Sequence, residues 1–112
     1  MDINQEEIES FGVKFSAKDE SGKEIGRAFL YVMKNDLHQR PFGFMEDVFV
    51  KEEARGQGIG KKLVQAVVEK ARENSCYKLI ATSRHSREKV HQMYENLGFY
   101  DQGLEFRIDF KF

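Results

Sequence analysis

The chain has 112 residues, of which 40% are hydrophobic and 33% are charged, with a net charge of −1 and one cysteine. This balance predicts a single folded domain over residues 1–112 rather than a disordered chain, and a lone cysteine excludes an internal disulfide. The acidic start is unlike a signal peptide, no apolar run is long enough to span a membrane, and the histidines lack metal-ligand spacing, so we expect a cytoplasmic protein with no metal and no membrane partner.

The first half of the chain predicts three strands. Weak alternation of apolar residues predicts a strand at 11–18, and the polar turn at 19–22 joins it to a second strand at 24–33 as a hairpin. The apolar run 42–50 then predicts a third strand. Only residues 1–10 precede the first strand.

The second half predicts two helices and a strand between them. Apolar residues recur at helical spacing from Ile59 to Ala71, which predicts a helix at 59–73. The short apolar run 77–82 follows that helix, so we expect a strand parallel to the third one. Ser86 is placed to cap a second helix, and Gly98 is placed to end it.

The end of the chain predicts a closing pair of strands at 99–100 and 104–110, joined by a turn. Together these elements predict an α/β (α+β) fold with a mixed, mostly antiparallel sheet and two main helices.

Three glycines on alternate residues, Gly56, Gly58 and Gly60, separate the third strand from the first helix. Such a junction offers unpaired backbone N–H groups and the positive end of a helix dipole to an anion, and glycines allow close approach of the backbone. The spacing is neither that of a P-loop nor the Gly-x-Gly-x-x-Gly of a dinucleotide site. The sequence therefore predicts a site for a phosphate-bearing ligand, and this site matches neither of the two nucleotide-binding motifs.

Two segments carry a resemblance to a known family. Arg55, Gly58 and Gly60 match Arg/Gln-x-x-Gly-x-Gly/Ala, the pyrophosphate signature of the GNAT N-acetyltransferases, and residues 93–99 resemble the Tyr-Glu-x-Leu-Gly-Phe helix end of that family. The resemblance covers roughly residues 42–110. It implies an enzyme that uses acetyl-CoA as co-substrate.

The resemblance also implies where acetyl-CoA would bind. The strand amides of Val48, Phe49 and Val50 would hold the pantetheine arm, with the Val48 N–H as oxyanion donor. The pyrophosphate would lie on the turn, whose residues are Arg55, Gly56, Gln57, Gly58, Ile59, Gly60 and Lys61. Arg55 would support either the turn or a phosphate. Arg87 stands where many members have asparagine, and it would either reach a 3′-phosphate or lie on the surface.

Three residues are candidate catalytic groups. Glu46-Asp47 resembles the pair that flanks the acceptor amine in the polyamine branch of the family, and such an amine must lose a proton before it attacks a thioester. Because adjacent strand residues point to opposite faces, we expect at most one carboxylate to face the acceptor, Glu46 first and Asp47 second. A solvated edge or an ordinary ion pair is the alternative for both. Tyr94 would protonate the leaving thiolate, with packing on an apolar helix face as its alternative.

Members of the family usually begin with a strand and two helices that help to wall the acceptor site. In this sequence either the first ten residues supply a minimal strand, or the acceptor face is open and a second subunit closes it as a homodimer.

The charge distribution fits a polyanionic co-substrate and a cationic acceptor. Residues 1–54 carry 12 acidic and 7 basic side chains, and residues 55–112 carry 7 and 11. An uneven solvated surface would have the same pattern, and the interleaved charges of the second half are unlike a nucleic-acid site. We expect an N-acetyltransferase that acts on the primary amine of a small molecule, for example a polyamine-like one. A protein N-acetyltransferase, a non-catalytic CoA-binding module and a protein that has lost its ligand are the alternatives.

Overall fold

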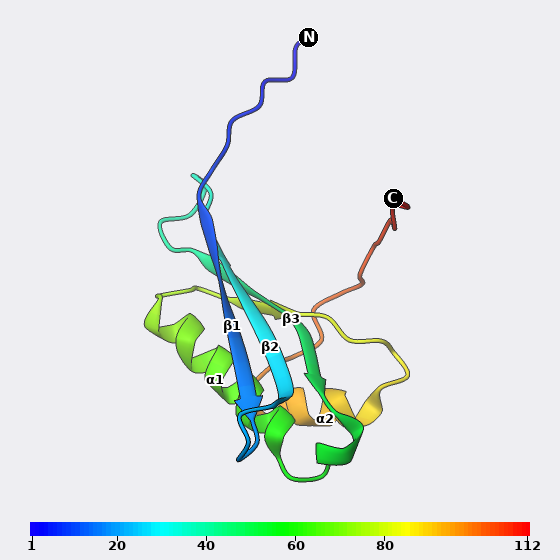
Figure 1. The fold of residues 1–112 in the computed structure, drawn as a ribbon. Helices are drawn as coiled ribbons and strands as arrows, with labels where there is room; N and C mark the ends of the chain where they lie inside the picture. Colours follow the sequence, from blue (N-terminus) through cyan, green and yellow to red (C-terminus); the bar gives the residue numbers. More distant parts are fainter. The chain divides into compact units, whose positions relative to one another are not determined.

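The computed structural model describes all residues from 1 to 112 and divides them into two compact units, residues 1–81 and 82–112. The first unit contains a four-stranded sheet and a long helix, and the second contains a shorter helix (Figure 1). Neither helix has the length and apolar character that crossing a membrane requires. The single domain over residues 1–112 stays a prediction.

The sheet of the first unit has the strand order β1-β2-β3-β4. Strands β1 (Ser10–Lys18), β2 (Glu24–Met33) and β3 (Phe42–Val50) are antiparallel neighbours, and β4 (Leu79–Ala81) is parallel to β3. The three predicted strands, the hairpin and the parallel strand are confirmed. β4 is shorter than the predicted span 77–82. The backbone of Tyr77 and Lys78 nevertheless forms hydrogen bonds with Pro41 and Gly43, so the chain runs beside the start of β3 before β4 begins.

The turn between β1 and β2 is held by one carboxylate. Asp19 accepts hydrogen bonds from the Ser21 hydroxyl (2.7 Å) and from the backbone N–H groups of Ser21 (2.9 Å) and Lys23 (3.0 Å). The Ser21 hydroxyl and the Lys23 N–H stabilise the charged form, so they hold the pKa of Asp19 below its ordinary value. Gly22 has a φ of 84°, in the left-handed region that favours glycine. The predicted turn is therefore confirmed, with its own internal bonds.

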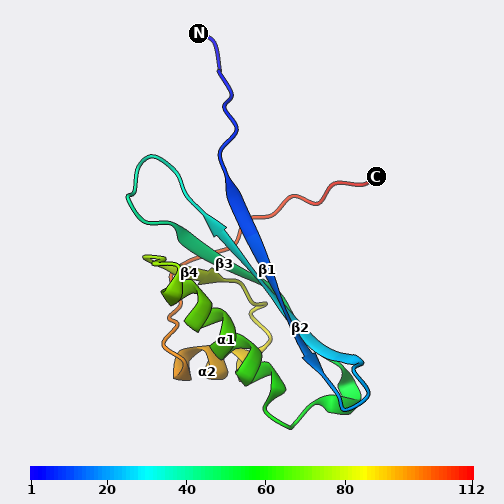
Figure 2. The same cartoon turned by 60° about the vertical axis from the view of Figure 1, so that its left-hand side comes forward.

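Helix α1 (Ile59–Glu73) covers one face of the sheet (Figure 2). Its apolar side chains lie at helical spacing and pack on alternate residues of the strands. The buried side chains of this core are Ala28, Leu30, Val32, Met45, Leu63, Val64, Val67 and Ala71. A Cβ at Gly26 would lie 3.2 Å from a Leu63 methyl carbon, so the helix packs closely on β2. This packing fixes the start of α1 close to the end of β3.

The second unit contains helix α2 (Glu88–Asn96), and its predicted cap is wrong. The N-cap residue is Arg87, and no side chain caps the helix. The reason is a turn in which the Arg87 N–H donates to the Arg84 carbonyl (3.1 Å), so the helix begins one residue later than a Ser86 cap would place it. At the other end Gly98, with a φ of 102°, follows the last helical turn as predicted.

The C-terminal end differs from expectation, and at the N-terminal end one of the two alternatives is removed. The closing strand pair at 99–100 and 104–110 is wrong, because no strand forms after α2. Apolar residues do alternate there, but Leu104, Phe106, Ile108 and Phe110 are 72–90% exposed. Alternation of apolar residues gives a segment one apolar face. A strand also needs a neighbouring strand that bonds its backbone groups, and the sheet contains only β1 to β4. Residues 1–9 are exposed and form no minimal first strand either.

Candidate active site

The junction between β3 and α1 has the predicted form of a strand, a glycine turn and a helix. A 3-10 turn at Glu52–Ala54 leads into Gly56 and Gly58, whose φ angles are 81° and 79°. Both angles lie in the left-handed region, where a side chain is strained. A Cβ at either glycine would meet no atom within 4 Å, so the backbone here faces open space. A ligand can therefore approach the main chain of this turn directly.

The start of α1 leaves backbone donors unpaired. Gly58 is the N-cap residue and has no side chain to bond them, and the first intrahelical bond runs from the Lys62 N–H to the Gly58 carbonyl (3.1 Å). The N–H groups of Ile59, Gly60 and Lys61 precede that bond. The first turn contains no acidic residue. Unpaired donors at the positive end of the helix dipole are what an anionic group needs.

Arg55 ties this turn back to the strand. Its Nε–H donates to the Val50 carbonyl (3.0 Å), and its guanidinium carbon lies 5.9 Å from the centre of the Phe49 ring. Of the two roles predicted for Arg55, support of the turn is the one that its hydrogen bond provides. Gln57, also predicted to contact phosphate, is exposed in the same turn.

A β-bulge interrupts β3 at the two candidate carboxylates. Glu46 pairs with Phe29 and Phe49 pairs with Arg27, so Asp47 and Val48 together face one residue of β2. Asp47 has a φ of 54°. The argument that neighbouring residues alternate between faces is therefore wrong at this point, because a bulge breaks the alternation, and Glu46 and Asp47 are both exposed.

The bulge gives a prediction for stability. Asp47→Val should lower the free energy of unfolding by about 1–2 kcal/mol, because a β-branched residue strongly disfavours the left-handed region. Asp47→Gly should leave it unchanged or raise it slightly, because glycine adopts this conformation without a penalty. Chemical denaturation measures both. Equal stability of the valine and glycine variants would contradict a left-handed Asp47.

Arg87 and Tyr94 belong to the second unit. Tyr94 lies on α2, is partly buried and packs on Phe99, with 5.2 Å between the ring centres. Burial raises the pKa of Tyr94, and the positive charge of Arg87 opposes this rise. The phenol therefore keeps its proton throughout the neutral range, as a proton donor must.

Arg27 is a residue that the sequence analysis missed. Its guanidinium carbon lies 4.8 Å from the centre of the Phe49 ring, which places a cation beside the end of β3. The pairing of Arg27 with Phe49 depends on the bulge. No local pattern in the sequence marks Arg27 as a site residue. Its position beside Phe49 follows only from the register of β2 with β3, including the bulge.

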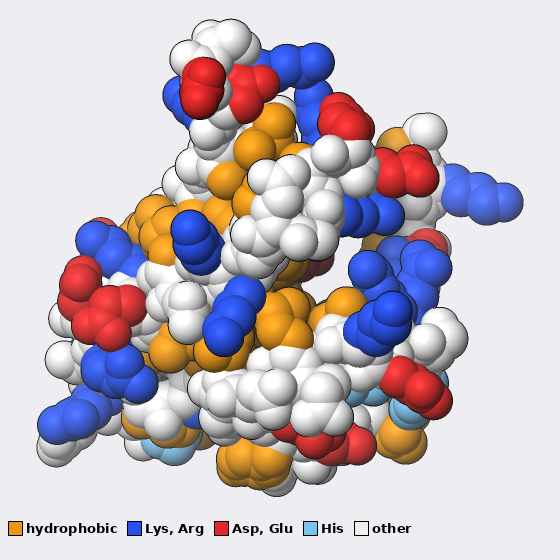
Figure 3. All heavy atoms as spheres, turned by 90° about the horizontal axis from the view of Figure 1, so that it is seen from below, with side chains coloured by type: hydrophobic (Ala, Val, Ile, Leu, Met, Phe, Trp, Pro, Cys, Tyr) orange, Lys and Arg blue, Asp and Glu red, His pale blue; other side chains and the backbone are white.

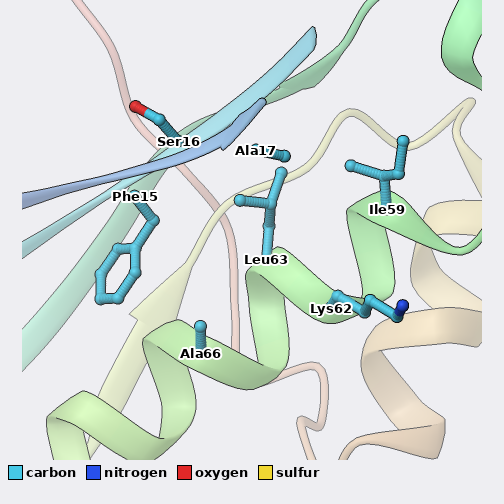
Figure 4. Close-up of a pocket in the computed structure, with 7 residues that line it drawn as sticks. All are labelled: Phe15, Ser16, Ala17, Ile59, Lys62, Leu63 and Ala66. Atoms are coloured by element: carbon cyan, nitrogen blue, oxygen red, sulfur yellow. The ribbon is translucent and has the colours of Figure 1, made fainter. Parts of the chain in front are cut away.

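A separate hollow of about 260 Å³ lies between β1 and α1 (Figure 4). Its lining is mainly apolar and consists of Phe15, Ser16, Ala17, Ile59, Lys62, Leu63 and Ala66. It contains neither candidate carboxylate. On the face drawn in Figure 3, basic and acidic side chains are interspersed with apolar ones and form no single charged block.

Comparison with known proteins agrees with the motifs. A model described as the acetyltransferase (GNAT) family matches residues 2–99. Glucosamine 6-phosphate N-acetyltransferase of Trypanosoma brucei brucei is 37% identical over 90 residues, which are 80% of this chain and 59% of that protein. Thialysine N-epsilon-acetyltransferase of Bos taurus is 36% identical over 58 residues, which are 52% of this chain and 34% of that protein. The chain thus spans less than two thirds of either relative.

The fold has relatives among solved structures as well. The structure of an acetyltransferase from Trypanosoma brucei superimposes with a TM-score of 0.81 at 31% sequence identity, covering 88% of this chain and 69% of that one.

Proposed function

Because the chain belongs to the acetyltransferase (GNAT) family, we propose that it transfers the acetyl group of acetyl-CoA to the primary amine of a small molecule. The observation that carries the proposal is the glycine turn, with open space over two left-handed glycines and unpaired N–H groups at the start of α1. Similarity to enzymes named for glucosamine 6-phosphate and thialysine favours a small-molecule acceptor.

The residues of the turn suit the pyrophosphate of acetyl-CoA. The N–H groups of Gly58, Gly60 and Lys61 would hold its oxygens, and Arg55 would keep the turn in place from its bond to Val50. The strand amides from Val48 to Val50 would hold the pantetheine arm. Arg87 would serve the 3′-phosphate.

The proposed reaction is direct attack in a ternary complex. Glu46, or Asp47 in its place, takes a proton from the acceptor ammonium, and the free amine nitrogen then attacks the thioester carbon. The Val48 N–H stabilises the oxyanion that develops. The carbon–sulfur bond then breaks, and Tyr94 gives its proton to the leaving thiolate. The nitrogen, which is cationic after the attack, loses its second proton to the Tyr94 phenolate, so the acetyl group stays on nitrogen as a neutral amide and Tyr94 is again a phenol. Glu46 releases the first proton to solvent. The products are the acetylated amine and CoA with a free thiol.

Two alternatives have different consequences. A protein N-acetyltransferase would fit the exposure of Glu46 and Asp47, which leaves room for a large acceptor. A non-catalytic CoA-binding module would bind acetyl-CoA equally well, but substitution of the candidate catalytic residues would have no effect on turnover.

The proposal is tested by calorimetric titration with acetyl-CoA, followed by a screen of amines in which the released thiol is measured. Binding together with amine-dependent thiol release is the expected result. Absence of acetyl-CoA binding to folded protein would overturn the proposal, and binding without transfer to small amines or peptides would favour the non-catalytic module.

Tyr94→Phe should lower kcat by about 10- to 100-fold and leave the KM for acetyl-CoA unchanged, because the ring remains and only the proton donor is lost. Since burial raises the pKa of Tyr94, the parent enzyme should lose this proton donor only above about pH 10. A pH profile of kcat for both proteins measures the effect. An unchanged kcat would assign Tyr94 to packing alone.

A further inference from the structure

The face of the sheet opposite α1 carries the candidate base and a cation together. Gly26, Ala28 and Leu30 of β2 are buried, and a Cβ at Gly26 would meet side chains of α1. Residues that alternate with them point away from the helix. Arg27 and Phe29 are such residues, and Phe29 is the pairing partner of Glu46. Arg27 and Glu46 therefore lie on the same face, on the two sides of the bulge.

Two other charges of this face are paired with each other. Lys14 forms an ion pair with Glu24 (2.8 Å), and the Ser16 hydroxyl also donates to that carboxylate (3.0 Å). Neither Arg27 nor Glu46 has an ion-pair partner among the salt bridges of the chain, which are Lys14–Glu24, Lys70–Glu73, Arg72–Glu69 and Arg107–Asp109. The hydrogen bond from Lys14 is the main cause that lowers the pKa of Glu24, and the charge of Arg27 contributes to lowering it. Arg27 forms no ion pair with that carboxylate, however, so Arg27 and Glu46 both keep polar groups that a ligand can bind.

The ring of Phe49 holds this cation in place. The guanidinium of Arg27 lies 4.8 Å from the ring centre, and that of Arg55 lies 5.9 Å from it. Two guanidinium groups therefore lie beside one ring, and neither forms an ion pair with a carboxylate. The planar fork of Arg27 is suited to bind a carboxylate or a phosphate through two N–H groups.

We propose, resting on the proposed acetyl transfer, that the acceptor is a small primary amine that also carries an anionic group. Its ammonium is bound at Glu46 and its phosphate or carboxylate at Arg27, which determines specificity without touching the reacting atoms. A polyamine would bring a second ammonium against Arg27 and Arg55 and would bind weakly. This structure therefore favours an acceptor of mixed charge over the polyamine-like one suggested by the Glu46-Asp47 pair.

Two matched pairs of amines test this inference on the full chain. Glucosamine 6-phosphate is compared with glucosamine, and lysine with cadaverine, so that each pair differs by one anionic group. We expect the anionic member of at least one pair to have a kcat/KM about 10- to 100-fold higher. The pair that shows the difference distinguishes a phosphate from a carboxylate.

Variants then locate the effect. Arg27→Met should remove the preference by lowering kcat/KM for the anionic amine alone, and Arg27→Lys should restore part of it, because the charge returns without the planar fork. Lys70→Met is the control, because it removes a cation that is ion-paired with Glu73 on α1, on the other face of the sheet, and it should change the preference by less than about twofold. The KM for acetyl-CoA should stay constant throughout.

Several results would overturn the inference. Cadaverine and glucosamine could be used as well as their anionic partners, Arg27→Met could impair all four amines equally, or it could raise the KM for acetyl-CoA and so assign Arg27 to the co-substrate. Binding of acetyl-CoA with transfer to none of the four amines would exclude this acceptor class while leaving co-substrate binding intact. Failure to bind acetyl-CoA would instead overturn the proposed function itself.

Discussion

Gly58→Glu should weaken acetyl-CoA binding by at least about 100-fold, which is about 2.7 kcal/mol at 25 °C. Gly58 is the N-cap residue of α1, and a Cβ there would enter open space beside the unpaired N–H groups. The new carboxylate would occupy the space predicted for the pyrophosphate, compete for its donors and repel its charge. Calorimetric titration measures the loss. Gly58→Ala, which adds no charge, should have a smaller effect.

Gly22 provides a matched control for the backbone. It also has a left-handed φ (84° against 79°), and a Cβ there would also meet no atom within 4 Å. Gly22→Glu should therefore lower stability by about the same 1–2 kcal/mol as Gly58→Glu, while acetyl-CoA affinity stays near that of the parent. Thermal denaturation checks the stability of both. If both variants lost affinity equally, the loss would come from strain, and the turn would not be the phosphate site.

Glu46→Gln should lower kcat by about 100- to 1,000-fold at neutral pH, because the acceptor ammonium then has no base to take its proton. Acetyl-CoA affinity should not change. With cadaverine as acceptor, the residual activity of the variant should rise by about tenfold per pH unit up to the pKa of an alkylamine near 10, because the free amine becomes more abundant in solution. Steady-state kinetics between pH 7 and 9 measure both effects.

Asp47→Asn separates the two carboxylates. Asparagine tolerates the left-handed backbone of Asp47, so this variant removes the charge and keeps the bulge. We expect it to retain most of kcat. A loss of about 100- to 1,000-fold in Asp47→Asn, with Glu46→Gln as active as the parent, would assign the base to Asp47. Full activity of both variants would show that neither carboxylate is the base.

The strands, the first helix and the glycine turn could be predicted from the sequence because their signals are local. Two of the three glycines of the turn, Gly56 and Gly58, lie where the backbone needs a left-handed φ, and helical spacing marks the buried face of α1. The same local signals failed at 104–110, where alternation was present and a strand was not. A strand depends on hydrogen bonds to another part of the chain, and alternation does not supply them.

The chain's own residues thus determined the glycine turn, since a glycine-rich strand-to-helix junction has its unpaired donors wherever it occurs. Tertiary structure decided which side chains of β2 and β3 lie together on the face of the sheet next to this turn. The bulge at Asp47 shifts the register by one residue, which puts Arg27 opposite Phe49 and places Glu46 on the same face. A one-residue shift reverses the side on which every later side chain lies, and only the pairing of β2 with β3 reveals where that shift occurs.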